Sequence, residues 1–125
     1  MNSSFEDKEQ LYRAVLPQNE TSFLWKHDGT ISAAALRDKK GLSMDRGNYR
    51  TDEEVVEYMS KDFHGTVFAL TVKDCRDENA IVLYKPTERS IYHSEIHGSK
   101  DTPLLSGAQR KHLINKIRIV QEIKQ

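Results

Sequence analysis

The run Thr66–Val72 is the feature that most constrains the fold, because its residues, Thr-Val-Phe-Ala-Leu-Thr-Val, are β-branched or apolar throughout. Such a run is typical of a strand that is buried on both faces of a sheet. The chain therefore needs further strands beside this one and helices to cover it. Because only 37% of the 125 residues are hydrophobic and 30% are charged, the sequence predicts one domain with a modest core.

Further strands and two helices follow from local patterns. The additional strands are expected at Gln10–Leu16, Leu42–Asp45, Ala80–Tyr84 and Ser90–His97. Capping boxes at Thr51–Glu54 and Ser106–Gln109 predict a mid-chain helix over 52–61 and an amphipathic C-terminal helix that runs to about Ile123. The predicted fold class is α+β, with a small mixed or antiparallel sheet of about five short strands. Residues 1–9 are expected to be a flexible N-terminus and residues 10–125 a single domain.

Composition narrows the function classes. The 19 basic and 19 acidic side chains cancel, which argues against nonspecific nucleic-acid binding. Within 106–125, however, basic residues outnumber acidic ones, and Lys111 and Arg118 lie on the polar stripe of the expected helix as candidate binding residues. No run is long and apolar enough for a membrane span, and the first residues lack the pattern of a secretory signal. The lone Cys75 can form no disulfide within the chain, so we expect a cytoplasmic protein.

Two strands carry candidate site residues. Arg13 is a charge within an otherwise apolar strand, and its planar fork suits phosphate or carboxylate. The segment Gly41–Gly47 holds Ser43, Asp45 and Arg46 close together and is a candidate pocket wall, although a Gly-x-Ser-x-Gly nucleophile elbow is missing from it. The alternative for both segments is ordinary polarity on a half-exposed strand.

The run Tyr92–Gly98 contains the densest set of reactive side chains. On a strand His93, Glu95 and His97 share one face, which would offer a general base, a carboxylate and a second imidazole. The two imidazoles would lie roughly 13 Å apart along such a strand, so we predict no metal site. A solvated outer face of the sheet is the alternative. Arg13, Ser43, His93 and Glu95 are the candidate catalytic residues, and Arg46 and His97 are candidate binding residues.

Several short motifs carry a family resemblance. In order they are Leu11-Tyr12-Arg13-Ala14, Gly41-Leu42-Ser43-Met44-Asp45-Arg46, Thr51-Asp52-Glu53-Glu54 and His93-Ser94-Glu95-Ile96-His97-Gly98. This series resembles a group of small uncharacterised bacterial proteins, which implies a bacterial or mobile-element source and no particular activity. The order of Arg13, Ser43 and Glu95 is also similar to the ADP-ribosyltransferase fold. That resemblance implies NAD as a ligand, with Arg13 on its phosphates, Ser43 at the nicotinamide ribose and Glu95 at the ribose 2′-hydroxyl.

Two functions from different classes remain open. The first is an accessory or protein-interaction domain, in a defence or toxin–antitoxin setting, that needs no cofactor. It would contact a protein partner through the basic C-terminal helix or through the His93–His97 face. The second is an enzyme that acts on a nucleotide-like ligand through Arg13, Ser43 and His93 or Glu95. Convergence of Arg13, Ser43 and His93 or Glu95 in one concave pocket would favour the enzyme. The sequence leaves the oligomeric state undetermined.

Overall fold

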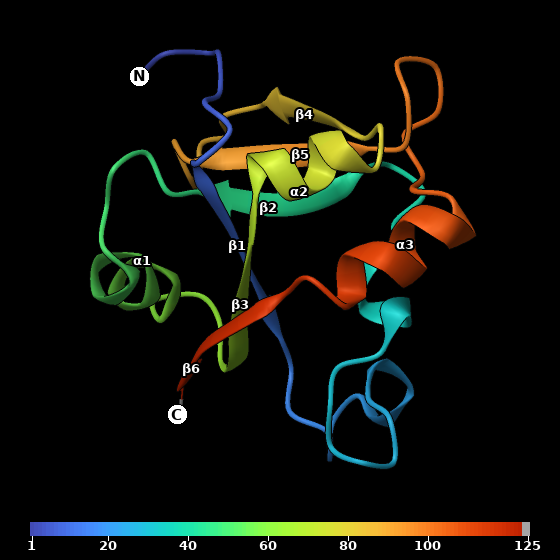
Figure 1. The fold of residues 1–125 in the computed structure, drawn as a ribbon. Helices are drawn as coiled ribbons and strands as arrows, with labels where there is room; N and C mark the ends of the chain where they lie inside the picture. The colour runs from blue at the N-terminus through green and yellow to red at the C-terminus, as the bar shows by residue number, and fades with distance from the viewer. Residues whose placement is uncertain (124–125) are drawn as a thin grey trace.

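The computed structural model describes residues 1–123, and within them it shows an open antiparallel sheet of six strands in the order β4-β5-β2-β1-β3-β6 (Figure 1). The strands are β1 (Gln10–Val15), β2 (Leu42–Arg46), β3 (Gly65–Thr71), β4 (Ile81–Tyr84), β5 (His93–His97) and β6 (Arg118–Ile123). The helices are α1 (Asp52–Met59), α2 (Val72–Asp77) and α3 (Gly107–Ile114), with short 3-10 turns η1 (Ser22–Leu24) and η2 (Ala33–Leu36). The predicted α+β class is therefore confirmed. Lys124 and Gln125, the end of the expected domain, lie outside the described residues.

The apolar run Thr66–Val72 forms most of β3, which lies between β1 and β6, and Val72 starts α2. Its side chains from Val67 to Leu70 are all buried, and they alternate between two hydrophobic clusters on opposite faces of the sheet. Phe68 and Leu70 pack in the larger cluster, whereas Val67 and Ala69 pack in the smaller one. This is the burial on both faces that the sequence predicted.

Helix α1 covers only part of one sheet face. Its buried side chains Val55, Val56 and Met59 pack against β1, β3 and β6. Strands β2 and β5 lie on the far side of β1 from that contact, and on this face their side chains are only half buried. The opposite face is covered by η2, α2 and α3 around the larger cluster. This part of the α1 face is therefore left open beside α1.

The predicted C-terminal helix is wrong beyond Ile114. The capping box at Ser106 does start α3, but this helix has eight residues, and Arg118–Ile123 forms the edge strand β6. Strand β6 pairs antiparallel with β3, with a register shift at Val67/Phe68. The helical spacing of Leu113, Ile117 and Val120 misled the sequence analysis, because pairing with β3 supplies the backbone hydrogen bonds that a longer helix would have supplied.

A third capping box was not expected. The side chains of Thr71 and Asp74 each bond the other's backbone N–H, and they start α2 where the sequence indicated only a polar turn. Helix α2 buries Cys75 completely, and this burial raises the pKa of its thiol to about 12.

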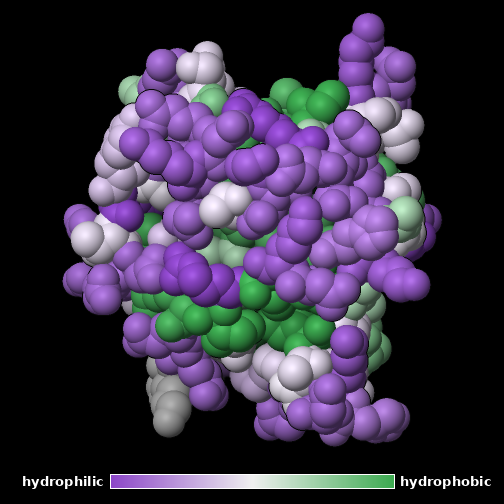
Figure 2. Space-filling view, viewed as in Figure 1, coloured by the Kyte–Doolittle hydropathy of each residue, from purple (hydrophilic) through white to green (hydrophobic). Residues whose placement is uncertain are grey.

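The first residues of the chain lie against the sheet. Phe5 is buried in the larger cluster, and the backbone carbonyls of Asn2 and Ser4 accept hydrogen bonds from Arg46. Figure 2 shows that polar side chains dominate one face of the molecule, with an apolar band over β6. No helix within residues 1–123 could cross a membrane, since the longest have eight residues.

Candidate functional site

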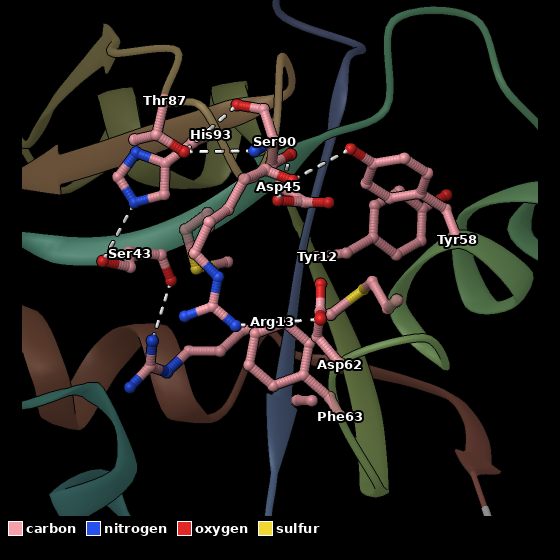
Figure 3. A pocket seen from close by; sticks show the side chains of 14 residues that line it. Tyr12, Arg13, Ser43, Asp45, Tyr58, Asp62, Phe63, Thr87, Ser90 and His93 are labelled. Carbon is pink, nitrogen blue, oxygen red and sulfur yellow. Dashed lines mark hydrogen bonds and ion pairs between the residues drawn. The ribbon is translucent and has the colours of Figure 1, made fainter.

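A pocket of about 420 Å³ lies on the uncovered part of the α1 face. Its floor comes from β1, β2 and β5. One wall comes from the end of α1 and the turn after it, and the other comes from the β4–β5 loop (Figure 3). This volume falls in the range of small-molecule sites. Among the predicted catalytic residues, Arg13, Ser43 and His93 all line it.

Ser43 and His93 form a hydrogen-bonded pair on the pocket floor. The antiparallel register places Ser43 opposite Glu95 and Asp45 opposite His93, so Ser43 and His93 are diagonal neighbours on the same face. His93 Nε2 lies 3.2 Å from Ser43 Oγ, and His93 Nδ1 lies 2.8 Å from the Lys85 carbonyl oxygen. Because a carbonyl can only accept, Nδ1 carries the proton. In the neutral ring Nε2 then accepts from the Ser43 hydroxyl.

Arg13 holds the backbone beneath this pair. Strands β1 and β2 are paired only at Leu11–Arg46 and Tyr12–Asp45, and the Arg13 guanidinium reaches β2 beyond that point. Its Nη1 donates to the Ser43 carbonyl oxygen at 2.8 Å, while its buried Nε has no partner among the described residues. Burial lowers the pKa of the guanidinium, and the charge of Asp38 opposes that shift. Arg13 therefore fixes the position of Ser43 from below.

Asp45 provides a carboxylate beside the pair. It precedes Arg46 on β2, and its Oδ1 accepts from Ser90 Oγ at 3.3 Å. Desolvation raises the pKa of this carboxyl, which the positive charge of Arg50 and the Ser90 hydrogen bond partly offset. The Ser90 hydroxyl also accepts from the Tyr92 backbone N–H, so the β4–β5 loop is tied to the floor of the pocket.

The wall opposite Ser43 and His93 is aromatic. Figure 3 shows Tyr12, Tyr58 and Phe63 on that side of the opening. Tyr58 is held by an edge-to-face contact with Tyr92, with ring centres 5.2 Å apart, and its hydroxyl donates to the Arg89 carbonyl oxygen at 3.4 Å. Burial, together with a hydrogen bond from its hydroxyl to Asp52, raises the pKa of Tyr12 to about 12.

An ion pair crosses the rim of the pocket. Arg89, from the β4–β5 loop, lies with its Nη2 3.7 Å from Asp62 Oδ1, and Asp62 follows α1. The Arg89 side chain is 79% exposed, so this contact is loose and costs little to break. The pair joins the two walls at the point where a ligand would enter.

Glu95 and His97 lie outside the pocket. His97 Nε2 is 2.8 Å from Glu95 Oε1, and the Lys85 ammonium is 3.8 Å from the same oxygen. Gly41 lies against this pair, and a Cβ added at Gly41 would be 2.5 Å from His97 Nε2. The predicted sharing of one strand face is confirmed by the β2–β5 register, but Glu95 is occupied by its neighbours and His93 alone reaches the pocket.

The other predicted binding residues are dispersed. Arg46 is only 2% exposed and pairs with Glu9. Lys111 is exposed on α3, whereas Arg118 belongs to β6 and binds Asp52 at 2.7 Å. A single basic helix face that would carry both residues is not formed, because the helix ends at Ile114.

Sequence reasoning missed much of the pocket. Asp45 belongs to the segment that the sequence predicted as a pocket wall, but it was not chosen as a candidate catalytic or binding residue, although it lies two residues after Ser43 and therefore shares its strand face. Tyr58, Phe63, Arg89 and Ser90 gave no local signal, since α1 and the β4–β5 loop reach the site only through the packing of the chain. Within residues 1–123, moreover, no three His, Cys, Asp or Glu side chains are grouped as metal ligands.

Comparison with known proteins adds no relative. The chain matches no family model, and no curated protein or solved structure matches it either.

Proposed function

We propose that this protein is an enzyme that performs acid–base chemistry on a small, ring-bearing substrate of the nucleotide class. The observation that carries the proposal is the Ser43–His93 hydrogen bond inside a pocket with an aromatic wall. The Ser43–His93 pair lies on one side of the pocket and aromatic side chains lie on the other. This arrangement suits a ligand that has both a flat ring and hydroxyl or phosphate groups.

The roles of the polar residues follow from their hydrogen bonds. His93 is the general base, because its Nδ1–H is fixed on the Lys85 carbonyl and its Nε2 lone pair faces Ser43. The proton of a substrate hydroxyl passes to Ser43 Oγ while the Ser43 proton passes to Nε2. Arg13 is a positioning residue, since it holds the Ser43 backbone through its guanidinium. Glu95, the alternative base, is paired with His97 and takes no part.

The protein-interaction hypothesis has less support. It required the basic C-terminal helix or the His93–His97 face as a contact surface. Lys111 and Arg118 lie on different elements, and Arg118 is neutralised by Asp52. The His93–His97 face is divided between the pocket floor and the Glu95–His97 pair. A cytoplasmic location and a bacterial source stay predictions.

Thermal shift and product analysis test the proposal. The purified protein is mixed with a panel of nucleotides that includes NAD, and melting temperature and products are followed. We expect at least one member to raise the melting temperature and to be converted. Ser43→Ala and His93→Ala should keep the thermal shift and lose roughly 100-fold or more in turnover. His112→Ala, on the exposed surface of α3, is the matched control and should behave as wild type. If no nucleotide raises the melting temperature and none is converted to a product, the proposal is overturned.

A further inference from the structure

Asp45 is the one carboxylate on the pocket floor, and it is only partly satisfied. Its Oδ1 accepts from Ser90 Oγ, and within residues 1–123 its carboxylate makes no other hydrogen bond and no ion pair. Arg50, whose positive charge acts on Asp45, forms no ion pair with it among residues 1–123, and its buried Nη1 has no hydrogen-bond partner there. Arg50 donates to the carbonyl oxygens of Gly47 and Arg46, and its guanidinium lies 3.3 Å from the ring centre of Tyr92.

Partial burial of this carboxylate costs free energy, and the one hydrogen bond from Ser90 offsets that cost only in part. A ligand that supplies N–H donors to Oδ2 and to the free lone pair of Oδ1 removes this cost. A carboxylate is best matched by two adjacent donors on one rigid edge, which form two parallel hydrogen bonds. An acceptor atom placed at the same point would instead be repelled.

The wall across from Asp45 limits the shape of that ligand. Tyr58 is fixed by the Tyr92 ring and by its bond to the Arg89 carbonyl, and Phe63 is 49% exposed beside it. Aromatic faces of this kind stack flat heterocycles. Asp62 at the rim is paired with Arg89, so the charge of Asp45 on the floor is what disfavours an anionic ring in the ligand.

We propose that Asp45 selects the ligand by accepting two adjacent N–H donors from a flat heterocycle, as the Watson–Crick edge of guanine presents them, while the ring lies against Tyr58 and Phe63. This inference rests on the proposed function and names the substrate class for the same pocket. The ring of the ligand is hydrogen-bonded to Asp45, and the hydroxyl-bearing part of the ligand faces Ser43 and His93.

Binding to the inactive double variant Ser43→Ala/His93→Ala tests this without interference from turnover. Isothermal titration with guanosine, inosine and adenosine probes the donors one at a time, because inosine lacks the 2-amino group and adenosine presents an acceptor beside its amino group. We expect guanosine to bind about 10-fold more tightly than inosine, and adenosine to bind most weakly, since inosine loses one hydrogen bond to the charged carboxylate and adenosine also places an acceptor against it.

Asp45→Asn in the same background replaces one acceptor by a donor, which suits adenine instead. The guanosine preference should then fall at least 10-fold and turn toward adenosine. Asp101→Asn, an exposed aspartate in the loop before α3, makes the same chemical change and should leave the order of affinities unchanged. Circular dichroism checks that Asp45→Asn is folded, and the desolvation of the native carboxylate predicts that the substitution does not lower stability at pH 7.

The outcomes separate the two proposals. Equal binding of the three nucleosides, or an unchanged preference in Asp45→Asn, overturns the role of Asp45 and leaves the Ser43–His93 chemistry standing. Failure of all three to bind, while another nucleotide binds and is converted, overturns the guanine-type edge alone. Failure of every nucleotide in both experiments overturns both proposals.

Discussion

Replacing Arg46 by methionine removes the most deeply buried charge of the described chain. The Arg46 side chain is 2% exposed and makes a two-pronged ion pair with Glu9, with N–O distances of 2.7 and 2.8 Å. Its remaining N–H groups donate to the carbonyl oxygens of Asn2 and Ser4, and its guanidinium lies 4.0 Å from the ring centre of Phe5. One side chain thus fastens the N-terminal segment to the sheet.

The expected loss of stability follows from what is left behind. Methionine fills a similar volume, but Glu9, only 11% exposed, then loses its ion-pair partner and keeps only the Asn48 backbone N–H as a donor, and two backbone carbonyls lose their donor. Removing one member of a buried ion pair costs about 3–5 kcal/mol. With a urea slope of about 1.5 kcal/mol/M, a loss of 3 kcal/mol lowers the unfolding midpoint by about 2 M.

Urea denaturation followed by tryptophan fluorescence, through Trp25, measures this midpoint. Arg76→Met is the matched control, because Arg76 also reaches the N-terminal segment, through Asp7 and the Phe5 carbonyl, but its side chain is 47% exposed. The control should lose only about 1 kcal/mol. Adding Glu9→Met to Arg46→Met should restore part of the stability, since the orphaned charge is gone. A loss below about 1 kcal/mol for Arg46→Met would show that the buried pair does not fasten the segment.

Three further predictions concern the rest of the fold. Gly65→Ala should destabilise the protein by more than about 2 kcal/mol in thermal denaturation, because Gly65 has φ +116° and an added Cβ would lie 2.1 Å from the Val15 carbonyl oxygen; a neutral effect would contradict this geometry. Cys75, whose thiol pKa burial raises to about 12, should resist alkylation by iodoacetamide at pH 8 and react only after unfolding, as mass spectrometry would reveal. Hydrogen bonds from Arg118 and Tyr12 hold the pKa of Asp52 below its usual range. The ionised carboxylate therefore stabilises the folded state at pH values above the pKa that Asp52 has in the unfolded chain. This stabilisation is lost as the pH falls through the pKa of Asp52 in the folded protein. The unfolding midpoint of Asp52→Asn should therefore fall less between pH 5 and pH 3 than that of wild type, and parallel curves would refute the assignment.

The local elements of this protein are encoded locally. The buried run at 66–72 predicted β3, alternation predicted β5, and the side chains at Thr51 and Ser106 predicted the starts of α1 and α3. These features depend on side chains within a few residues of one another, so the sequence alone is sufficient. The common face of His93, Glu95 and His97 belongs to the same class of inference.

Only the tertiary structure decided which of these residues meet. Ser43 and His93 are 50 positions apart, and their contact depends on the β2–β5 register, in which a shift by one residue would turn Ser43 to the other face. The strand at 118–123 likewise exists because β3 offers it an edge, although its own residues fit a helix as well. Pairing partners and the placement of α1 are properties of the whole chain. For this reason the sequence determined most of the elements and the candidate chemistry, whereas the fold brought Ser43, His93 and Asp45 together in one pocket.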